Sequence, residues 1–164
     1  MLKPYIMSTQ NKFTRIRTFK DYVGELTVTY RRTKELTTNI TCSKDAADYM
    51  RYHFDTCMDD HEEFKILHLN NANKVVHVDH ISVGTEVGTL VSIRRIIRNA
   101  LMTSSKAFLC FHNHPSSKLK PSLADKQVTK KIADAAALMD MKVLDHIILT
   151  REGYYSFADE GIMP

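Results

Sequence analysis

The sequence predicts a single α+β domain in which a mostly antiparallel or mixed β-sheet is flanked by helices. Length and composition are the first indication, because 164 residues with 43% hydrophobic side chains can build one sizeable core. The second is that strand-like runs and segments with apolar residues at helical spacing follow one another along the chain. The chain also has no internal repeat, low-complexity tract or linker, so nothing divides it into separate units.

The N-terminal part predicts an arm, a strand and a helix. Residues 1–24 are expected to form a flexible arm, since the chain begins polar and basic with little periodicity, and the domain is expected over residues 25–161. Residues 24–30 alternate apolar and polar side chains and predict a half-buried strand. Ser43 is a candidate N-cap for a helix over about residues 44–58.

The middle of the chain predicts a hairpin, a second helix and a buried strand. Residues 64–70 and 75–81 are strand-like runs, and the asparagines between them suit a tight turn. Apolar residues then recur at helical spacing over residues 91–101. Residues 107–111 form a short, continuous apolar run, which is typical of a central strand covered on both faces.

The C-terminal part predicts a third helix and two more strands. Pro121 favours a helix that begins at Ser122 or Leu123. Residues 142–150 form the next strand-like run, and a turn at Glu152-Gly153 leads into residues 154–157.

Charge, cysteines and hydropathy exclude several protein classes. The net charge of +4 comes from 23 basic and 19 acidic side chains spread along the chain, an excess too weak to indicate a nucleic-acid partner by itself. Three cysteines without a CxxC pair argue against a disulfide framework and a cysteine zinc site, and indicate reduced thiols in a cytoplasmic protein. The sequence has no signal-peptide pattern and no apolar run long enough for a membrane span, so no membrane association is expected.

A candidate metal site lies where the buried apolar run at residues 107–111 ends. His112 and His114 are two residues apart, so their side chains project to the same side of an extended segment. Asp125 follows in the first turn of the predicted third helix, which can bring it back toward them. Two imidazoles and one carboxylate form the three-ligand set of a catalytic Zn²⁺ site, with a fourth position left for water. Five other histidines are expected to be ordinary surface or core residues: His53, His61, His68, His77 and His80.

These residues resemble the JAMM signature of JAB/MPN metalloproteases. The signature has His-x-His, seven further residues and then Ser-x-x-Asp, which His112, His114, Ser122 and Asp125 match position for position. The wording HNHPSSKLKPSLADKQVTKK is similar to the RadC-like branch, as is the tail GYYSFADEG. The resemblance extends over roughly residues 25–161 and implies the JAB/MPN, cytidine-deaminase-like architecture.

The resemblance also implies catalytic roles. An upstream glutamate is the general base in this family, and here it is Glu62 or Glu63. Glu62 is preferred because the family places the glutamate two residues before a phenylalanine, here Phe64, and strand alternation turns Glu63 to the other face. Ser122 is expected to steady the oxyanion of the tetrahedral intermediate, although a helix N-cap is the simpler interpretation of the same serine.

Three further features bear on the resemblance. RadC-like sequences usually carry glycine at the position of Ser117, so serine costs strain if the backbone there needs a positive φ. Asp145 and His146 form a pair that recurs in the family, and they either support the metal ligands from behind or hydrogen bond within the core. RadC-type proteins also carry an N-terminal helix-hairpin-helix region, for which residues 1–24 are too short, so a DNA role does not carry over.

Three functions remain open from the sequence. The preferred one is a Zn²⁺-dependent hydrolase that cleaves an amide, peptide or isopeptide bond in a protein or peptide substrate. The second is a DNA-associated or protein-interaction module whose metal is structural or vestigial. The third is a nuclease, because an activated water can attack phosphorus as well as carbon. A site with an open fourth position favours the hydrolase.

Overall fold

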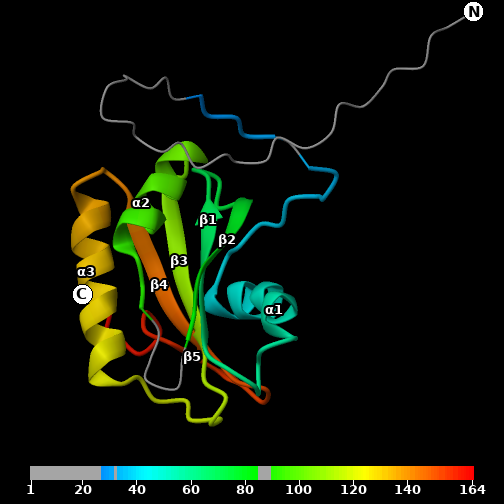
Figure 1. The fold of residues 1–164 in the computed structure, drawn as a ribbon, viewed down its shortest axis with the longest axis vertical. Coiled ribbons are helices and arrows are strands. Elements are labelled where there is room, and N and C mark those ends of the chain that lie inside the picture. Colours follow the sequence, from blue (N-terminus) through cyan, green and yellow to red (C-terminus); the bar gives the residue numbers. More distant parts are fainter. Residues whose placement is uncertain (1–26, 32, 85–89) are drawn as a thin grey trace, which may run out of the picture.

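The computed structural model describes residues 27–31, 33–84 and 90–164, which form an α+β domain built on one five-stranded sheet (Figure 1). In chain order the elements are α1 (Ser43–Phe54), β1 (Glu63–Leu69), β2 (Val75–Val83), α2 (Ile93–Met102), β3 (Ala107–Asn113), α3 (Leu123–Ala137), β4 (Lys142–Leu149) and β5 (Tyr154–Ser156). The predicted fold class is confirmed.

The sheet is mixed, with the strand order β2-β1-β3-β4-β5. β1 is antiparallel to both β2 and β3, β5 is antiparallel to β4, and β3 and β4 are parallel. Every residue of β1 and of β3 is buried, because both strands have neighbours on each side and helices cover both faces of the sheet. The predicted hairpin and the predicted central strand are therefore confirmed.

Helices cover the two faces of the sheet unequally, with α1 on one face and α2 and α3 on the other (Figure 1). Phe54 of α1 packs in one core with Leu67 and Phe111, whereas Ile132 of α3 packs in a second core with Phe108. Successive side chains of a strand point to opposite faces, so the two cores take alternate residues of β1 and β3. This alternation decides which side chains can reach the N-terminus of α3.

The third helix begins where the sequence predicts. Ser122 is the N-cap of α3, and its side chain accepts a hydrogen bond from the backbone N–H of Asp125. The Asp125 carboxylate accepts in return from the backbone N–H of Ser122, which completes a capping box. Two of the donors that a helix start leaves unpaired are satisfied in this way.

The strand predicted at residues 24–30 is wrong for the residues described, and residues 24–26 lie outside them. Residues 27–30 are exposed and form no strand. The backbone beside the start of β2 is taken by a later segment, since the N–H of Val75 donates to the carbonyl of Thr38 and Asn39 bridges to Lys74. Alternation predicts extended chain, but it does not specify which extended segment pairs with an edge strand.

The start and the end of the first helix also differ from the prediction. Cys42, not Ser43, is the N-cap, and the hydroxyl of Ser43 donates to the carboxylate of Asp159 at 2.6 Å. The helix ends at Phe54 rather than near residue 58, and the turns that follow bury Cys57. The hydroxyl of Ser43 is thus used for a long-range contact that local sequence rules do not reveal.

Three expectations concern the whole chain. The arm over residues 1–24 lies outside the described residues. Within the described part, none of the helices combines the length and apolar character that crossing a bilayer requires. Cys42, Cys57 and Cys110 are free thiols, of which the last two are buried.

Candidate metal centre

His112 and His114 lie at the C-terminal end of β3. His112 lies within the strand, and the backbone N–H of His114 still donates to the carbonyl of Leu149 at 2.9 Å, which continues the pairing with β4. The segment is therefore extended across both histidines, and their rings lie on the same side. The face that they share is the one covered by α3.

The first turn of α3 brings Asp125 to the two histidines. The Nε2 atoms of His112 and His114 are 2.9 Å apart, His112 Nε2 is 3.5 Å from Asp125 Oδ1, and His114 Nε2 is 4.0 Å from Asp125 Oδ2. Two ligands of a tetrahedral zinc ion lie about 3.3–3.6 Å apart, given bonds of about 2.0–2.2 Å. The three observed separations bracket this range, so the triad fits one zinc ion.

The triad has a buried side and an accessible side. The side chain of His112 is 1% exposed, whereas those of His114 and Asp125 are 15% and 16% exposed. An ion held there would contact the buried His112 on the side of the sheet and would be accessible to solvent on the side of His114 and Asp125. Among the residues described, the three are the one group of His, Cys, Asp and Glu side chains close enough to share an ion.

The surroundings of both histidines suit metal binding. His114 Nδ1 lies 2.7 Å from the carbonyl oxygen of Lys118. Because a carbonyl can only accept, Nδ1 carries the proton and Nε2 keeps a lone pair that points toward His112 and Asp125. Burial lowers the pKa of His112 to about 4, against the opposing influence of the Asp125 carboxylate. Only a neutral imidazole can bind a metal.

Asp125 is held by the N-cap of its own helix. Its Oδ2 accepts from the hydroxyl of Ser122 at 2.6 Å and from the backbone N–H of Ser122 at 2.7 Å. The other oxygen, Oδ1, is the one nearest His112 Nε2. Ser122 is thus the N-cap that the sequence offered as its simpler role, and its hydroxyl also orients one of the candidate ligands.

Alternation along β1 assigns the two candidate bases to different faces of the sheet. The Glu63 carboxylate lies on the α1 face, 2.7 Å from Lys65 Nζ and 3.0 Å from His61 Nε2. Burial opposes the ionisation of Glu63, but the hydrogen bonds from Lys65 and His61 outweigh it and lower its pKa to about 2. Glu62 directly precedes β1 and shares its alternation with Phe64, whose ring stacks on that of His112 with a centroid separation of 6.2 Å.

The structure separates Asp145 from His146. The Asp145 carboxylate accepts from the hydroxyl of Ser156 at 2.5 Å and from the backbone N–H of Ala158 at 2.9 Å, so it ties β4 to the segment after β5. His146 instead reaches the triad, with Nε2 2.8 Å from Nδ1 of His112. Burial raises the pKa of Asp145 and holds that of His146 well below its usual range.

Two buried residues next to the triad, Asn113 and Thr129, were not predicted from the sequence. The side-chain amide of Asn113 donates to the carbonyls of Cys57, Met58 and His61, and thereby fixes the loop that leads into Glu62. Thr129 lies one turn after Asp125 in α3 and contacts His146. Alternation between the two histidines was a signal for Asn113, because it turns that side chain to the opposite face. The i+4 spacing from Asp125 was the signal for Thr129.

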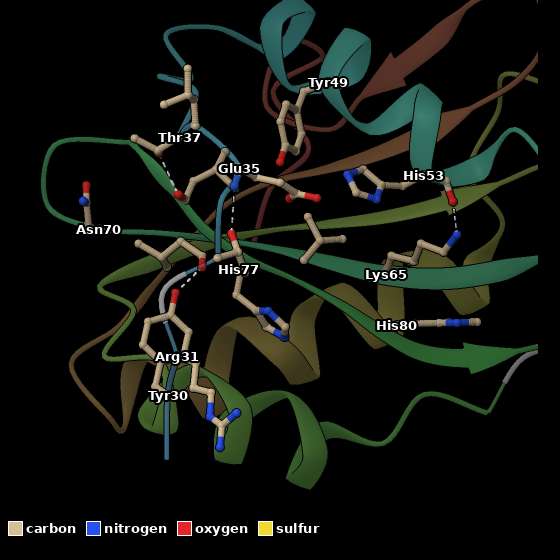
Figure 2. A pocket seen from close by; sticks show the side chains of 15 residues that line it. Tyr30, Arg31, Glu35, Thr37, Tyr49, His53, Lys65, Asn70, His77 and His80 are labelled. Atoms are coloured by element: carbon tan, nitrogen blue, oxygen red, sulfur yellow. Dashed lines mark hydrogen bonds between the residues drawn. The ribbon is translucent and has the colours of Figure 1, made fainter. Parts of the chain in front are cut away.

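A groove of about 1030 Å³ lies beside β2 and the end of α1, and Figure 2 shows the side chains that line it. Its lining includes His53, Lys65, His77 and His80, but none of the three triad residues. His68 is fully buried, and among the residues that the structure describes neither of its ring nitrogens has a hydrogen-bond partner. The five histidines expected to lie outside the metal site all lie outside the triad.

Comparison with known proteins identifies the family of the chain. A model of the family described as RadC-like JAB domain matches residues 40–162. A UPF0758 protein of Flavobacterium johnsoniae is 46% identical over 123 residues, which are 75% of this chain and 53% of that protein. UPF0758 proteins of Pelodictyon phaeoclathratiforme and Photorhabdus laumondii are 33% and 42% identical, over 86% and 62% of this chain and 63% and 44% of those proteins. The chain spans about half the length of the curated relatives it matches.

Proposed function

The chain belongs to the RadC-like JAB domain family, and from this premise we propose that it is a zinc-dependent hydrolase that cleaves an amide bond in a peptide or protein. The observation that carries the proposal is the convergence of His112, His114 and Asp125 at separations that suit one ion. An ion held by three protein ligands keeps a position open, which is typical of catalytic rather than structural zinc. Bound zinc would supply Lewis-acid chemistry, polarising a carbonyl and acidifying a water molecule.

The chain's own residues would manage the protons. Glu62 is the proposed general base: it takes the proton from the attacking water and passes it to the leaving amine. Glu63 is the weaker candidate, because its carboxylate lies beside Lys65 and His61 on the face of the sheet that carries α1, opposite the face of the triad. The hydroxyl of Ser122 donates to Asp125 Oδ2 in this structure, and we propose that it turns from Asp125 to donate to the oxyanion that forms on the substrate.

Two other functions receive less support. A nuclease of the two-metal type needs paired carboxylates around two ions. In the described parts of the chain, the candidate group has one carboxylate and two imidazoles. A purely structural metal is usually closed by a fourth protein ligand, and the accessible side of His114 and Asp125 argues against it. The names of the relatives, UPF0758, specify no reaction.

The proposed reaction is tested by paired substitutions at the two glutamates. The purified zinc-loaded protein would be incubated with a quenched fluorescent peptide library and with a peptide joined to lysine through an isopeptide bond. Glu62→Gln should abolish cleavage while zinc content stays at the wild-type level. Glu63→Gln should cleave at a rate close to that of the wild type. Full activity in Glu62→Gln with loss in Glu63→Gln would contradict the choice of base.

The same preparation separates the alternatives. Cleavage of DNA that requires magnesium or manganese and disappears in His114→Ala would favour a nuclease. If the zinc-loaded wild type leaves peptides, isopeptides and DNA intact but binds DNA or a protein partner, the domain is a binding module.

A further inference from the structure

We propose that Thr129 and His146 are positioning residues that fix the tautomer of His112, so that its Nε2 presents a lone pair to the metal. The inference rests on the zinc site proposed above and adds two residues that touch neither substrate nor metal. It concerns where the proton sits on neutral rings, and no proton is gained or lost.

A buried chain of hydrogen bonds links the three side chains. Nδ1 of His112 lies 2.8 Å from Nε2 of His146, and Nδ1 of His146 lies 2.6 Å from Oγ1 of Thr129. Thr129 Oγ1 in turn lies 2.5 Å from the backbone carbonyl oxygen of Asp125. Thr129 and His146 are fully buried and His112 is nearly so, which keeps water from replacing any of these contacts.

The direction of every bond in this chain follows from its last member. The carbonyl of Asp125 can only accept, so the single hydroxyl proton of Thr129 is donated there. Thr129 Oγ1 must then accept from His146, which places the proton of His146 on Nδ1 and leaves Nε2 bare. His112 must therefore donate from Nδ1 to His146 Nε2, and its own Nε2 is left with a lone pair.

The opposite direction would give a competing state that cannot bind metal. If Thr129 donated to His146, the proton of His146 would lie on Nε2 and that of His112 would also lie on Nε2. His112 could then donate to His114 Nε2, which is 2.9 Å away. In that state a proton lies between His112 Nε2 and His114 Nε2, the two nitrogens that would bind the metal. Thr129 Oγ1 would also face the carbonyl oxygen of Asp125 at 2.5 Å with no proton between the two oxygens. Thr129 disfavours it for this reason.

The series of hydrogen bonds also connects two of the candidate ligands, His112 and Asp125, to each other. His112 comes from β3 and Asp125 from α3, and Thr129 bonds the backbone of Asp125 while holding, through His146, the back of His112. One hydroxyl therefore sets the proton position of one ligand and the distance of the helix that carries another. Outer hydrogen bonds of this kind typically change metal affinity by about 10–100-fold when removed.

Zinc affinity in three threonine variants tests the inference. Thr129→Val keeps the shape of the side chain but removes the hydroxyl, so the dissociation constant for zinc, measured by competition with a chromophoric chelator, should rise about 10–100-fold. Thr129→Ser restores the hydroxyl and should stay within about threefold of the wild type. Thr103→Val is the matched control. The hydroxyl of Thr103, at the end of α2, also donates to the carbonyl four residues earlier, but Thr103 is not part of the hydrogen-bond chain to His112. Its affinity should not change.

Nitrogen NMR of the metal-free protein provides a readout that loss of packing alone would not move. In the wild type the ring protons of His112 and His146 should both be on Nδ1, and in Thr129→Val both should move to Nε2. Protonation of His146 on Nε2 in the wild type would overturn the inference without any variant. So would unchanged zinc affinity in a folded Thr129→Val. If the wild type binds no zinc at all, the metal site itself fails, and the tautomer measurement still decides the direction of the chain.

Discussion

His112 Nε2 and His114 Nε2 face each other at 2.9 Å, so the two ring nitrogens are directed at the same point beside Asp125. Each ring is held from behind, His112 through His146 and His114 through the carbonyl of Lys118. The two imidazoles are therefore fixed before any ligand arrives. Donors held in this way bind an ion with little reorganisation.

Ser122 has two roles that two substitutions can separate. Ser122→Ala removes both the helix cap and the hydroxyl, so the free energy of unfolding should fall by about 1 kcal/mol. Ser122→Gly removes the hydroxyl but costs only about a few tenths of a kcal/mol as an N-cap. If the hydroxyl stabilises an oxyanion, both variants should lose about 10²–10³ in kcat. Urea unfolding and peptide hydrolysis give the two quantities. A Ser122→Gly variant with unchanged kcat would restrict the serine to capping.

Ser117 adopts the left-handed conformation, which is the condition under which serine in place of the family's glycine costs strain. Its φ is 58° in the loop between His114 and Asp125. A serine there costs about 1–2 kcal/mol of strain, of which glycine returns a part because it loses more entropy on folding. Ser117→Gly should therefore raise the free energy of unfolding by about 0.5–1 kcal/mol. Ser116→Gly, where φ is not positive, is the control and should be destabilising. Thermal unfolding distinguishes the two, and the same sign for both would contradict the strain.

Asn113 is a buried polar residue next to the site whose side-chain amide makes several hydrogen bonds. Its buried Nδ2 donates to three carbonyls, at 3.0 Å from Cys57, 3.1 Å from Met58 and 2.8 Å from His61. Asn113→Asp keeps the shape but puts an acceptor opposite these acceptors, which should cost about 3 kcal/mol or more. The exposed turn residue Asn71 provides a matched control, and Asn71→Asp should change stability by less than about 0.5 kcal/mol. Equal effects in urea unfolding would show that the amide contacts matter little.

His68 gives the fold a pH dependence that is independent of the metal. Burial lowers its pKa to about 4, whereas the unfolded chain takes up a proton near about 6.5. As the pH falls below about 6.5 the unfolded state binds the proton first, so the folded state loses stability down to about pH 4, on the order of 3 kcal/mol.

Replacing His68 by leucine removes this contribution. His68→Leu should be more stable than the wild type at pH 5 and should show a flatter dependence of the free energy of unfolding on pH. Leucine also removes two buried ring nitrogens that have no hydrogen-bond partner among the described residues, which should further raise the free energy of unfolding. An unchanged profile in His68→Leu would mean that His68 is hydrated or protonated when folded.

Local patterns predicted the parts of the fold that depend on local chemistry. Alternation and turn residues located the β1–β2 hairpin, the apolar run located β3, and proline followed by serine located the start of α3. The signature also named His112, His114 and Asp125, which the fold brings together. These predictions depend on neighbours in sequence or on a spacing that one strand and one helix turn determine.

Features set by packing between distant segments could not be predicted in this way. Residues 27–30 have the pattern of a strand, but residues 38 and 39 pair with the start of β2 in their place. Ser43 has the side chain of an N-cap, but it bonds Asp159. The Asp145 and His146 pair divides between two contacts because neighbouring residues of β4 point to opposite faces. Thr129 acquires its role only because α3 packs on β4.

Metal content is the most direct test of the central claim. Purified wild-type protein and the His112→Ala/His114→Ala double variant would be loaded with zinc, desalted and measured by elemental mass spectrometry, with circular dichroism to verify that both are folded. The account predicts about one zinc ion per wild-type chain and none in the variant. A wild type without zinc, or a folded double variant that retains it, would contradict the metal centre and with it the proposed hydrolase.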